Sequence, residues 1–341
     1  MHGRRRRTRA AVWLTGAAAL LVIGGSAATV GLVRMQREDP KPPAAAEPAA
    51  LAPPRRPDQI TIDINTTSGM VAAVRGTDST RQFVTARDVS LGAAKGGRYA
   101  GEVSAYEPGT FDSAPLRGGT VVNVAGHDAL YVPAYTFAAL SEGDAAHRSP
   151  AIGWKDPSGA WLLVYSAPGE KLAREDLTRL AESVLLPGPR DLRTPFRLGA
   201  LPNGLAATYV RSAEEADGRG GTVGLSDPRR KASSAAVYEG APYGVTVSIS
   251  AFAPDSKWAA QRATLGRSTR VNGYTAWYSE GKNMLSPEGN GSVLVLETEH
   301  CVVMLRTADR EKISRAELNH TVEEMTIGDC GDPDTWITPL G

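Results

Sequence analysis

The sequence lacks the residue combinations from which common catalytic sites are built. Its 341 residues contain only 2 cysteines and 5 histidines. They contain no G-x-S-x-G, no H-E-x-x-H and no phosphate-binding glycine loop. The one adjacent histidine–acid pair, His127 and Asp128, falls in a predicted turn, where a solvated surface pair is the ordinary interpretation. We therefore expect no catalytic, metal-binding or cofactor-binding residue, and we do not expect an enzyme.

The chain also lacks a strong charge of either sign. Lys and Arg total 38 and Asp and Glu total 37, which gives a formal net charge of +1. A protein that binds nucleic acid needs a positive field to attract phosphates, so the composition does not predict a nucleic-acid partner. The densest basic run, Arg4–Arg7 followed by Arg9, stands immediately before a long apolar stretch.

That apolar stretch, Ala10–Val33, predicts a transmembrane helix. At about 1.5 Å of rise per residue it extends roughly 35 Å, which is enough to cross a hydrocarbon core of about 30 Å. The arginines before it favour a cytoplasmic tip at residues 1–9, with the bulk of the chain on the outer side. The membrane is thus a predicted partner, through a single-pass anchor. The alternative is a cleaved signal peptide with Ser26–Ala28 at the cleavage site, and either interpretation exports the remainder.

Beyond the anchor, residues 34–57 carry seven prolines and predict a semi-extended spacer that packs as neither helix nor sheet. From Asp58 the pattern changes to short strands. Ile60, Ile62 and Ile64 alternate with polar residues, as in a half-buried strand. Further strands are expected near residues 82–85, 101–106, 120–123 and 222–225.

The chain after the spacer repeats itself. Val124–Tyr131 (VAGHDALY) matches Val271–Tyr278 (VNGYTAWY), and in each copy a predicted hairpin and then an amphipathic helix follow. The helices are expected within Leu172–Val184 and Ile313–Met325, the second starting with a capping box. The predicted fold class is α+β, with two tandem copies of an antiparallel sheet covered by one C-terminal helix. Module 1 is assigned to residues 58–189 and module 2 to residues 190–341.

Cys301 and Cys330 are the only cysteines, and both lie on the predicted outer side. In an oxidising compartment such a pair favours a disulfide, which would close a loop of about 30 residues and contribute about 2–4 kcal/mol. The bridge would join the helix of module 2 to its sheet. The alternative is two buried free thiols.

The order of strand, V-x-G-x-x-A-x-Y turn, hairpin and L-x-R-E-D-L-x-R-L-A-E-S-V helix resembles a known arrangement. It resembles uncharacterised actinobacterial single-pass membrane proteins with tandem extracytoplasmic α+β modules. It is also similar to the outer domains of anti-sigma-type regulators and of their RseB-like partners. The resemblance implies a module that senses or binds and does not catalyse. A cytoplasmic tip of nine residues is too short to hold a sigma factor, so the resemblance implies an accessory outside the membrane.

The sequence therefore predicts a membrane-anchored extracytoplasmic protein of non-enzymatic type. Its expected role is protein interaction or envelope sensing, with an envelope protein as partner. The alternative is a carrier or binder of a lipid or other apolar ligand, held beneath the helices by the apolar strands Trp161–Tyr165 and Val293–Leu296. The sequence predicts no cofactor and does not predict the oligomeric state.

Overall fold

The computed structural model describes residues 50–89, 98–137, 148–166, 172–214, 218–229, 245–281 and 290–341. The chain from Pro48 to Gly341 forms one compact unit. The predicted transmembrane segment Ala10–Val33 and the tip before it lie outside the described residues. Within the described ranges, no helix is both long enough and apolar enough to cross a membrane.

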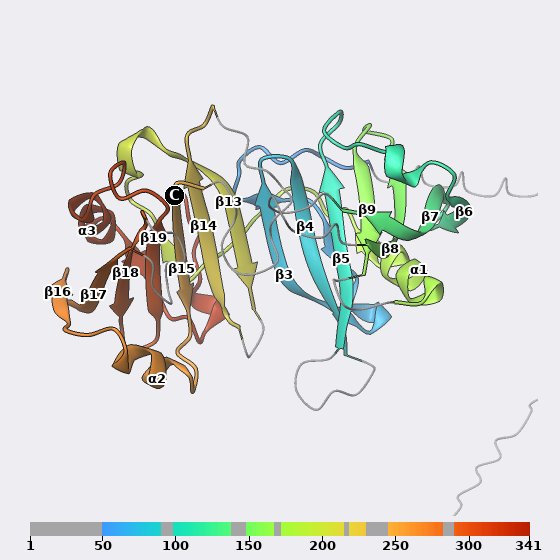
Figure 1. The fold of residues 1–341 in the computed structure, drawn as a ribbon. Helices are drawn as coiled ribbons and strands as arrows, with labels where there is room; N and C mark the ends of the chain where they lie inside the picture. The colour runs from blue at the N-terminus through green and yellow to red at the C-terminus, as the bar shows by residue number, and fades with distance from the viewer. Residues whose placement is uncertain are drawn as a thin grey trace, which may run out of the picture. The chain divides into compact units, whose positions relative to one another are not determined.

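A single antiparallel sheet of 14 strands dominates the fold (Figure 1). Its first half contains β3 (Met70–Asp78), β4 (Arg81–Asp88), β5 (Arg98–Tyr106), β6 (Thr120–Val124), β7 (His127–Thr136), β8 (Arg148–Lys155) and β9 (Trp161–Tyr165). Its second half contains β13 (Ala206–Ala213), β14 (Gly220–Ser226), β15 (Val247–Phe252), β16 (Thr269–Val271), β17 (Tyr274–Glu280), β18 (Ser292–Glu297) and β19 (Val302–Thr307). From the central β3–β13 pair outward, the order is β3-β4-β5-β9-β8-β7-β6 on one side and β13-β14-β15-β19-β18-β17-β16 on the other. The sequence repeat is therefore also a repeat of strand order.

The predicted fold class, α+β with two tandem sheets each covered by one helix, is wrong. The two copies share one sheet, because Val74–Asp78 of β3 pairs with Tyr209–Ala213 of β13. Two separate sheets would leave the N–H and C=O groups along both of these edge strands unpaired, whereas pairing them satisfies those groups. The described part of the chain is consequently mostly β, with three short α-helices.

Two of the helices, α1 (Arg174–Glu182) and α3 (Arg315–Glu323), pack on the same face of the sheet, here called the covered face. α1 buries Leu177, Leu180 and Ala181, and α3 buries Leu318, Thr321 and Val322, so the predicted apolar stripes are confirmed. Each fully buried leucine contributes about 1.5–3 kcal/mol. The predicted capping box of α3 is present between Ser314 and Glu317. Apolar side chains of both halves form one continuous core beneath the two helices.

Short two-stranded pairings complete the covered face. β1 (Gln59–Ile60) pairs with β11 (Arg190–Asp191), β2 (Asp63–Ile64) with β10 (Val184–Leu185), and β12 (Phe196–Arg197) with β20 (Thr326–Ile327). Ile60, Ile62 and Ile64 are buried as the alternation predicts, but their segment lies over the large sheet and is not one of its strands.

The last part of the predicted spacer, residues 50–57, is packed against the first half. Leu51 is buried, and its backbone N–H donates a hydrogen bond to Oδ1 of Asp156 at 3.1 Å. The hydroxyl of Thr77 also donates to the carbonyl of Pro57. These residues form neither helix nor strand, as the prolines predict, but they pack against the first half and so do not act as a free spacer. Residues 34–49 of the spacer lie outside the described part of the chain.

The repeated V-x-G motif forms the same turn in both halves. Ala125 and Gly126 connect β6 to β7 with φ of 48° and 89°, and Asn272 and Gly273 connect β16 to β17 with φ of 47° and 80°. Two consecutive residues with positive φ are characteristic of the tight hairpin loop that matches the twist of the strands. The glycine therefore has a conformational role in each copy.

A disulfide joins Cys301, in the β18–β19 turn, to Cys330, which follows β20. The two Cα atoms are 5.3 Å apart, and both residues are fully buried. The bridge ties the segment after α3 to the hairpin of the second half.

Candidate functional site

The face of the sheet opposite α1 and α3 is here called the outer face. Two small apolar clusters lie on it, one in each half. The cluster of the first half includes Leu116, Leu163 and Tyr165. In the second half, Trp258 of α2 (Trp258–Ala263) packs against Trp277 with ring centroids 6.2 Å apart. The outer face also carries a group of polar side chains in each half.

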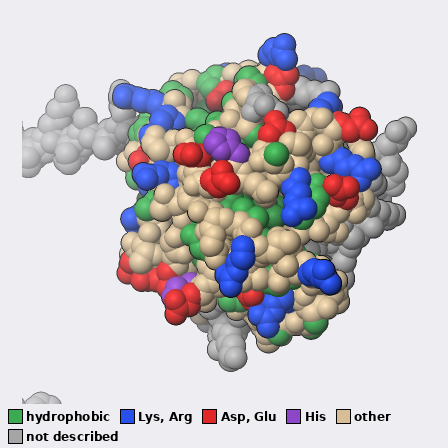
Figure 2. Space-filling view, turned by 90° about the vertical axis from the view of Figure 1, so that its left-hand side faces the viewer, with side chains coloured by type: hydrophobic (Ala, Val, Ile, Leu, Met, Phe, Trp, Pro, Cys, Tyr) green, Lys and Arg blue, Asp and Glu red, His purple; other side chains and the backbone are tan. Residues whose placement is uncertain are grey.

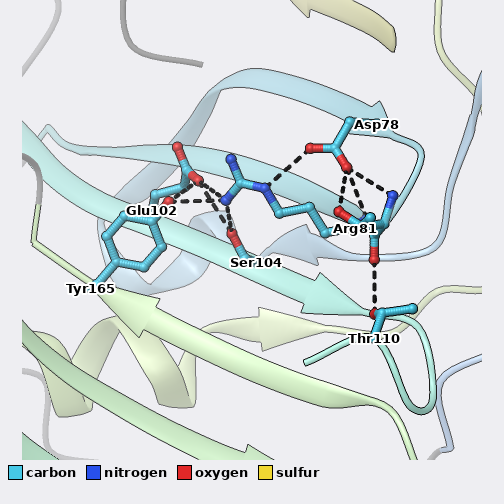
Figure 3. A network of polar contacts seen from close by, with 7 residues as sticks. Asp78, Arg81, Glu102, Ser104, Thr110 and Tyr165 are labelled. Carbon is cyan, nitrogen blue, oxygen red and sulfur yellow. Dashed lines mark hydrogen bonds and ion pairs between the residues drawn. The ribbon is translucent and has the colours of Figure 1, made fainter. Parts of the chain in front are cut away.

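In the first half, a polar network surrounds Arg81, which is only 6% exposed (Figure 3). Its Nη1 donates hydrogen bonds to Oε1 of Glu102 at 2.8 Å, to Oγ of Ser104 at 2.6 Å and to Oη of Tyr165 at 3.0 Å. Its Nε donates to Oδ2 of Asp78 at 3.3 Å, and the hydroxyl of Tyr165 donates to Glu102. We call this set of residues the closed network, because each member is bonded to another.

The electrostatics of the closed network keep its cation charged. Burial opposes the charge on Arg81, but Tyr165 and Glu102 outweigh burial and raise the pKa of its guanidinium well above the usual value. Burial raises the pKa of the neighbouring Tyr106 phenol, which therefore stays neutral. An aromatic ring lies under the guanidinium, since Cζ of Arg81 is 5.3 Å from the centroid of Phe83. The arrangement ties strands β4, β5 and β9 to one another through side-chain hydrogen bonds.

The second half differs, because a hollow of about 240 Å³ opens on its outer face. Its walls come from β13, β14, β15 and β19 and the residues next to β14: Arg211, Gly218, Gly220, Gly221, Thr222, Ser250, Ala251, Phe252, Met304 and Arg306. The hollow exists because β14 and β15 present small side chains there. The hydroxyls of Thr222 and Ser250 lie 3.1 Å apart and bond to each other.

Two arginines line this hollow without a carboxylate partner among the described residues. Arg306 is half-buried, its Nε is buried without a hydrogen-bond acceptor, and its Nη2 lies 3.7 Å from the sulfur of Met304. Burial lowers the pKa of Arg306 below its usual value. The side chain of Arg211 forms no hydrogen bond or ion pair with any residue in the described ranges. We call Arg211, Arg306 and the small residues between them the open site.

The end of the sheet that carries α3 shows no comparable concentration of one charge. Figure 2 faces that end and shows Lys and Arg side chains interspersed with Asp and Glu, with hydrophobic side chains in small patches. Mixed surface charge of this kind contributes to solubility and gives no directional field. The open site is therefore distinguished by its hollow and its two arginines, and not by an excess of one charge at this end of the molecule.

The histidines considered in the sequence do not come together. His127 lies at the start of β7, His300 lies 3.9 Å from Asp329, and His320 lies 3.6 Å from Glu323. His2 and His147 are outside the described residues. No three His, Cys, Asp or Glu side chains in the described ranges are grouped as metal ligands.

Sequence reasoning missed both Arg211 and Arg306. A single arginine in a strand gives no motif, and it is ordinarily interpreted as a solvated side chain. The signal that could have found them is the repeat itself, since the second copy has no acidic residue where the first copy has Glu102.

Comparison with known proteins adds little. No protein-family model matches the sequence, and no curated protein matches it. Among solved structures, the chain is similar to the Pseudomonas aeruginosa MucA/MucB complex, with a TM-score of 0.20 and 10% identity over 77% of this chain and 95% of that chain. It is also similar to MucB in complex with MucA(peri), with a TM-score of 0.19 and 10% identity over 77% of this chain and 96% of that one. TM-scores this low carry no argument about fold or function.

Proposed function

We propose that the chain is a non-enzymatic binding protein of the cell envelope that docks a protein partner over the open site. One observation carries the proposal. Arg211 and Arg306 line a preformed hollow without a described carboxylate partner, whereas Arg81 on the same face is fully paired. A half-buried cation without a partner destabilises a fold, and a bound group that pairs with it removes that cost.

The chemistry of the open site supports binding in preference to catalysis. Its polar groups are two guanidiniums and the hydroxyls of Thr222 and Ser250. A nucleophilic hydroxyl needs a general base within hydrogen-bond reach, and the described partner of each hydroxyl is the other hydroxyl. These groups can bind and orient a ligand, and none of them activates one.

The packing also favours a protein partner over the apolar-ligand alternative. A lipid would need an apolar cavity between the helices and the sheet. On the covered face, Leu162, Leu177 and Leu180 belong to one continuous cluster and are essentially inaccessible. The hollow of the outer face is lined mainly by glycine, hydroxyl and arginine, which suits a polar ligand.

We also propose that the described unit works outside the cytoplasm. Disulfides persist in oxidising compartments and are rare in the cytosol. The bridge between Cys301 and Cys330 is fully buried, and its two ends belong to segments that pack together.

The proposal is tested by photo-crosslinking in cells that make the full-length chain. A crosslinking residue replaces Ser250, which lines the hollow, and in a control it replaces Arg117, which is exposed in the first half. We expect one defined protein adduct from position 250 that position 117 does not give, and an excess of unlabelled chain should compete it away. Adducts that are the same at both positions, or that contain lipid only, would contradict the proposal.

A further inference from the structure

The two halves of the sheet provide an internal comparison, because each outer-face position in one half has a counterpart in the other. In the first half, Phe83 pairs across the ladder with Ser104, which pairs with Leu163. In the second half, Thr222 pairs with Ser250, which pairs with Met304. The same ladders make Gly220 the counterpart of Arg81, Ser248 the counterpart of Glu102 and Arg306 the counterpart of Tyr165.

The first consequence concerns volume. In the first half, the side chain of Arg81 lies over the ring of Phe83, and together they fill the outer face between β4 and β5. Their counterparts, Gly220 and Thr222, are small, and both line the hollow. The hollow is the space that the larger side chains occupy in the other half.

The second consequence concerns charge. The closed network contains one cation, Arg81, and two carboxylates, those of Asp78 and Glu102. The open site contains two cations and no carboxylate from the described residues, because Ser248 stands at the position of Glu102. The second half therefore lacks both the cation and the anion of the closed network, and it carries two cations at other positions, with Arg306 standing where the first half has Tyr165.

We infer that the open site takes the carboxylate side chain of an acidic segment in a partner protein. This inference rests on the proposed function and names the chemistry of the same site. The partner's carboxylate would pair with Arg306 and Arg211, as Glu102 pairs with Arg81 in the first half. A guanidinium donates in a planar fork that matches two carboxylate oxygens, and a hydroxyl at the Thr222–Ser250 pair can add a donor. The volume, about 240 Å³, suits one or two side chains.

The binding test uses the purified full-length chain and a short end-blocked oligoglutamate peptide, with an oligoglutamine peptide of equal length as the neutral control. We expect the glutamate peptide to bind, and added salt to weaken that binding because salt screens partly exposed charges. Arg306→Gln or Arg211→Gln should each raise the Kd by roughly tenfold or more, as charge-assisted hydrogen bonds predict. Arg117→Gln removes an exposed arginine of the first half and should leave the Kd unchanged.

A second pair of variants tests the site without any ligand. Ser250→Glu places a carboxylate in the hollow, and Ser250→Gln places a neutral group of the same size there. We expect both to abolish peptide binding, but only the glutamate to raise the melting temperature at low salt, because only it pairs with the arginines. Equal melting temperatures would overturn the charge argument.

Two further results would overturn the inference. Inorganic phosphate or phosphatidylglycerol vesicles that bind through the same arginines, with no binding of the glutamate peptide, would make the ligand a phosphate. Glutamate binding that survives both Arg→Gln substitutions would place the peptide elsewhere. Failure of the inference remains distinguishable from failure of docking, because a protein adduct at position 250 that persists in the Arg→Gln variants supports docking without acidic recognition.

Discussion

Removing Arg81 should destabilise the protein more than neutralising Glu102, although the two side chains form one ion pair. The carboxylates of Asp78 and Glu102 have exposed fractions of 3% and 7% and share Arg81 as their cation. In Arg81→Met both would be left buried without a cation. In Glu102→Gln the guanidinium keeps Asp78 at 3.3 Å and its hydrogen bonds to Ser104 and Tyr165.

The magnitudes follow from these contacts. Breaking a buried ion pair by removing one partner costs about 3–5 kcal/mol, and Arg81→Met should fall in that range or above it. Glu102→Gln loses a charge but keeps an acceptor, so it should cost about 1–3 kcal/mol. The double variant, with Arg81→Met and Glu102→Gln together, should lose less free energy of unfolding than the sum of the two single losses. In it, Asp78 is the only one of the two carboxylates left without a cation. Against a typical stability of about 5–15 kcal/mol, the larger loss is readily measured.

Urea unfolding followed by circular dichroism gives the three free energies, and pH provides the internal check. In Arg81→Met both buried carboxylates lack a cation, and protonation at low pH removes the cost of their buried charge. The difference in the free energy of unfolding between Arg81→Met and Glu102→Gln should therefore become smaller as the pH falls. Equal losses at neutral pH, or a difference that does not change with pH, would show that the buried carboxylates do not depend on Arg81 for their stability.

Three further predictions concern stability. Burial raises the pKa of the fully buried Asp58 even though its Oδ1 forms an ion pair with Nε of Arg56 at 3.2 Å. Asp58→Asn should therefore raise the urea midpoint at pH 7, and the gain should shrink as the pH falls through that raised pKa. Replacing Cys301 and Cys330 together by serine should cost about 2–4 kcal/mol, and a reductant should then shift the melting temperature of the wild type but not of the variant. Ala125 has a φ of 48°, so Ala125→Gly should stabilise by up to about 1 kcal/mol, whereas Asn272→Ala should destabilise, as paired thermal melts would show.

Local features of the fold could be predicted from the sequence because each depends on a short pattern. The turn at Gly126 and the capping box at Ser314 both follow from residues that are near neighbours in the chain. The repeat added long-range information, since it predicted that both halves end in a helix that packs on a sheet. These elements are confirmed.

The joining of the halves could not be predicted in the same way. β3 has the mixed sequence MVAAVRGTD and a bulge between Ala72 and Val74, which obscures its alternation. Its partner β13 has the sequence AATYVRSA, in which apolar and polar residues do not alternate strictly. Which edge strand pairs with which is decided by backbone groups that every residue possesses, so side-chain periodicity carries no information about the β3–β13 pair.

The candidate site was hidden for a related reason. Two facts from the strand pairing identify Arg306 as part of a candidate site. Its ladder partner is Ser248 and not an acidic residue, and Gly220 occupies the position that Arg81 has in the first half. In the sequence these residues are separated by up to 86 positions (306 − 220) and match no motif. The structure is needed to turn the repeat into a comparison of facing positions.

The duplication also explains how the fold tolerates an open site. Two features reduce the stability of the second half. Two half-buried arginines have no described carboxylate partner, and the small Thr222 stands where the first half has Phe83. The continuous core of the covered face includes Val84 of the first half and Ile249 of the second, and the sheet crosses from one half to the other through β3 and β13. A copy that shares its core and its sheet with a closed copy does not have to be stable alone. In a single-copy protein the same hollow would reduce the stability of the whole fold, whereas here the closed network of the first half helps to support the scaffold from which the second half binds.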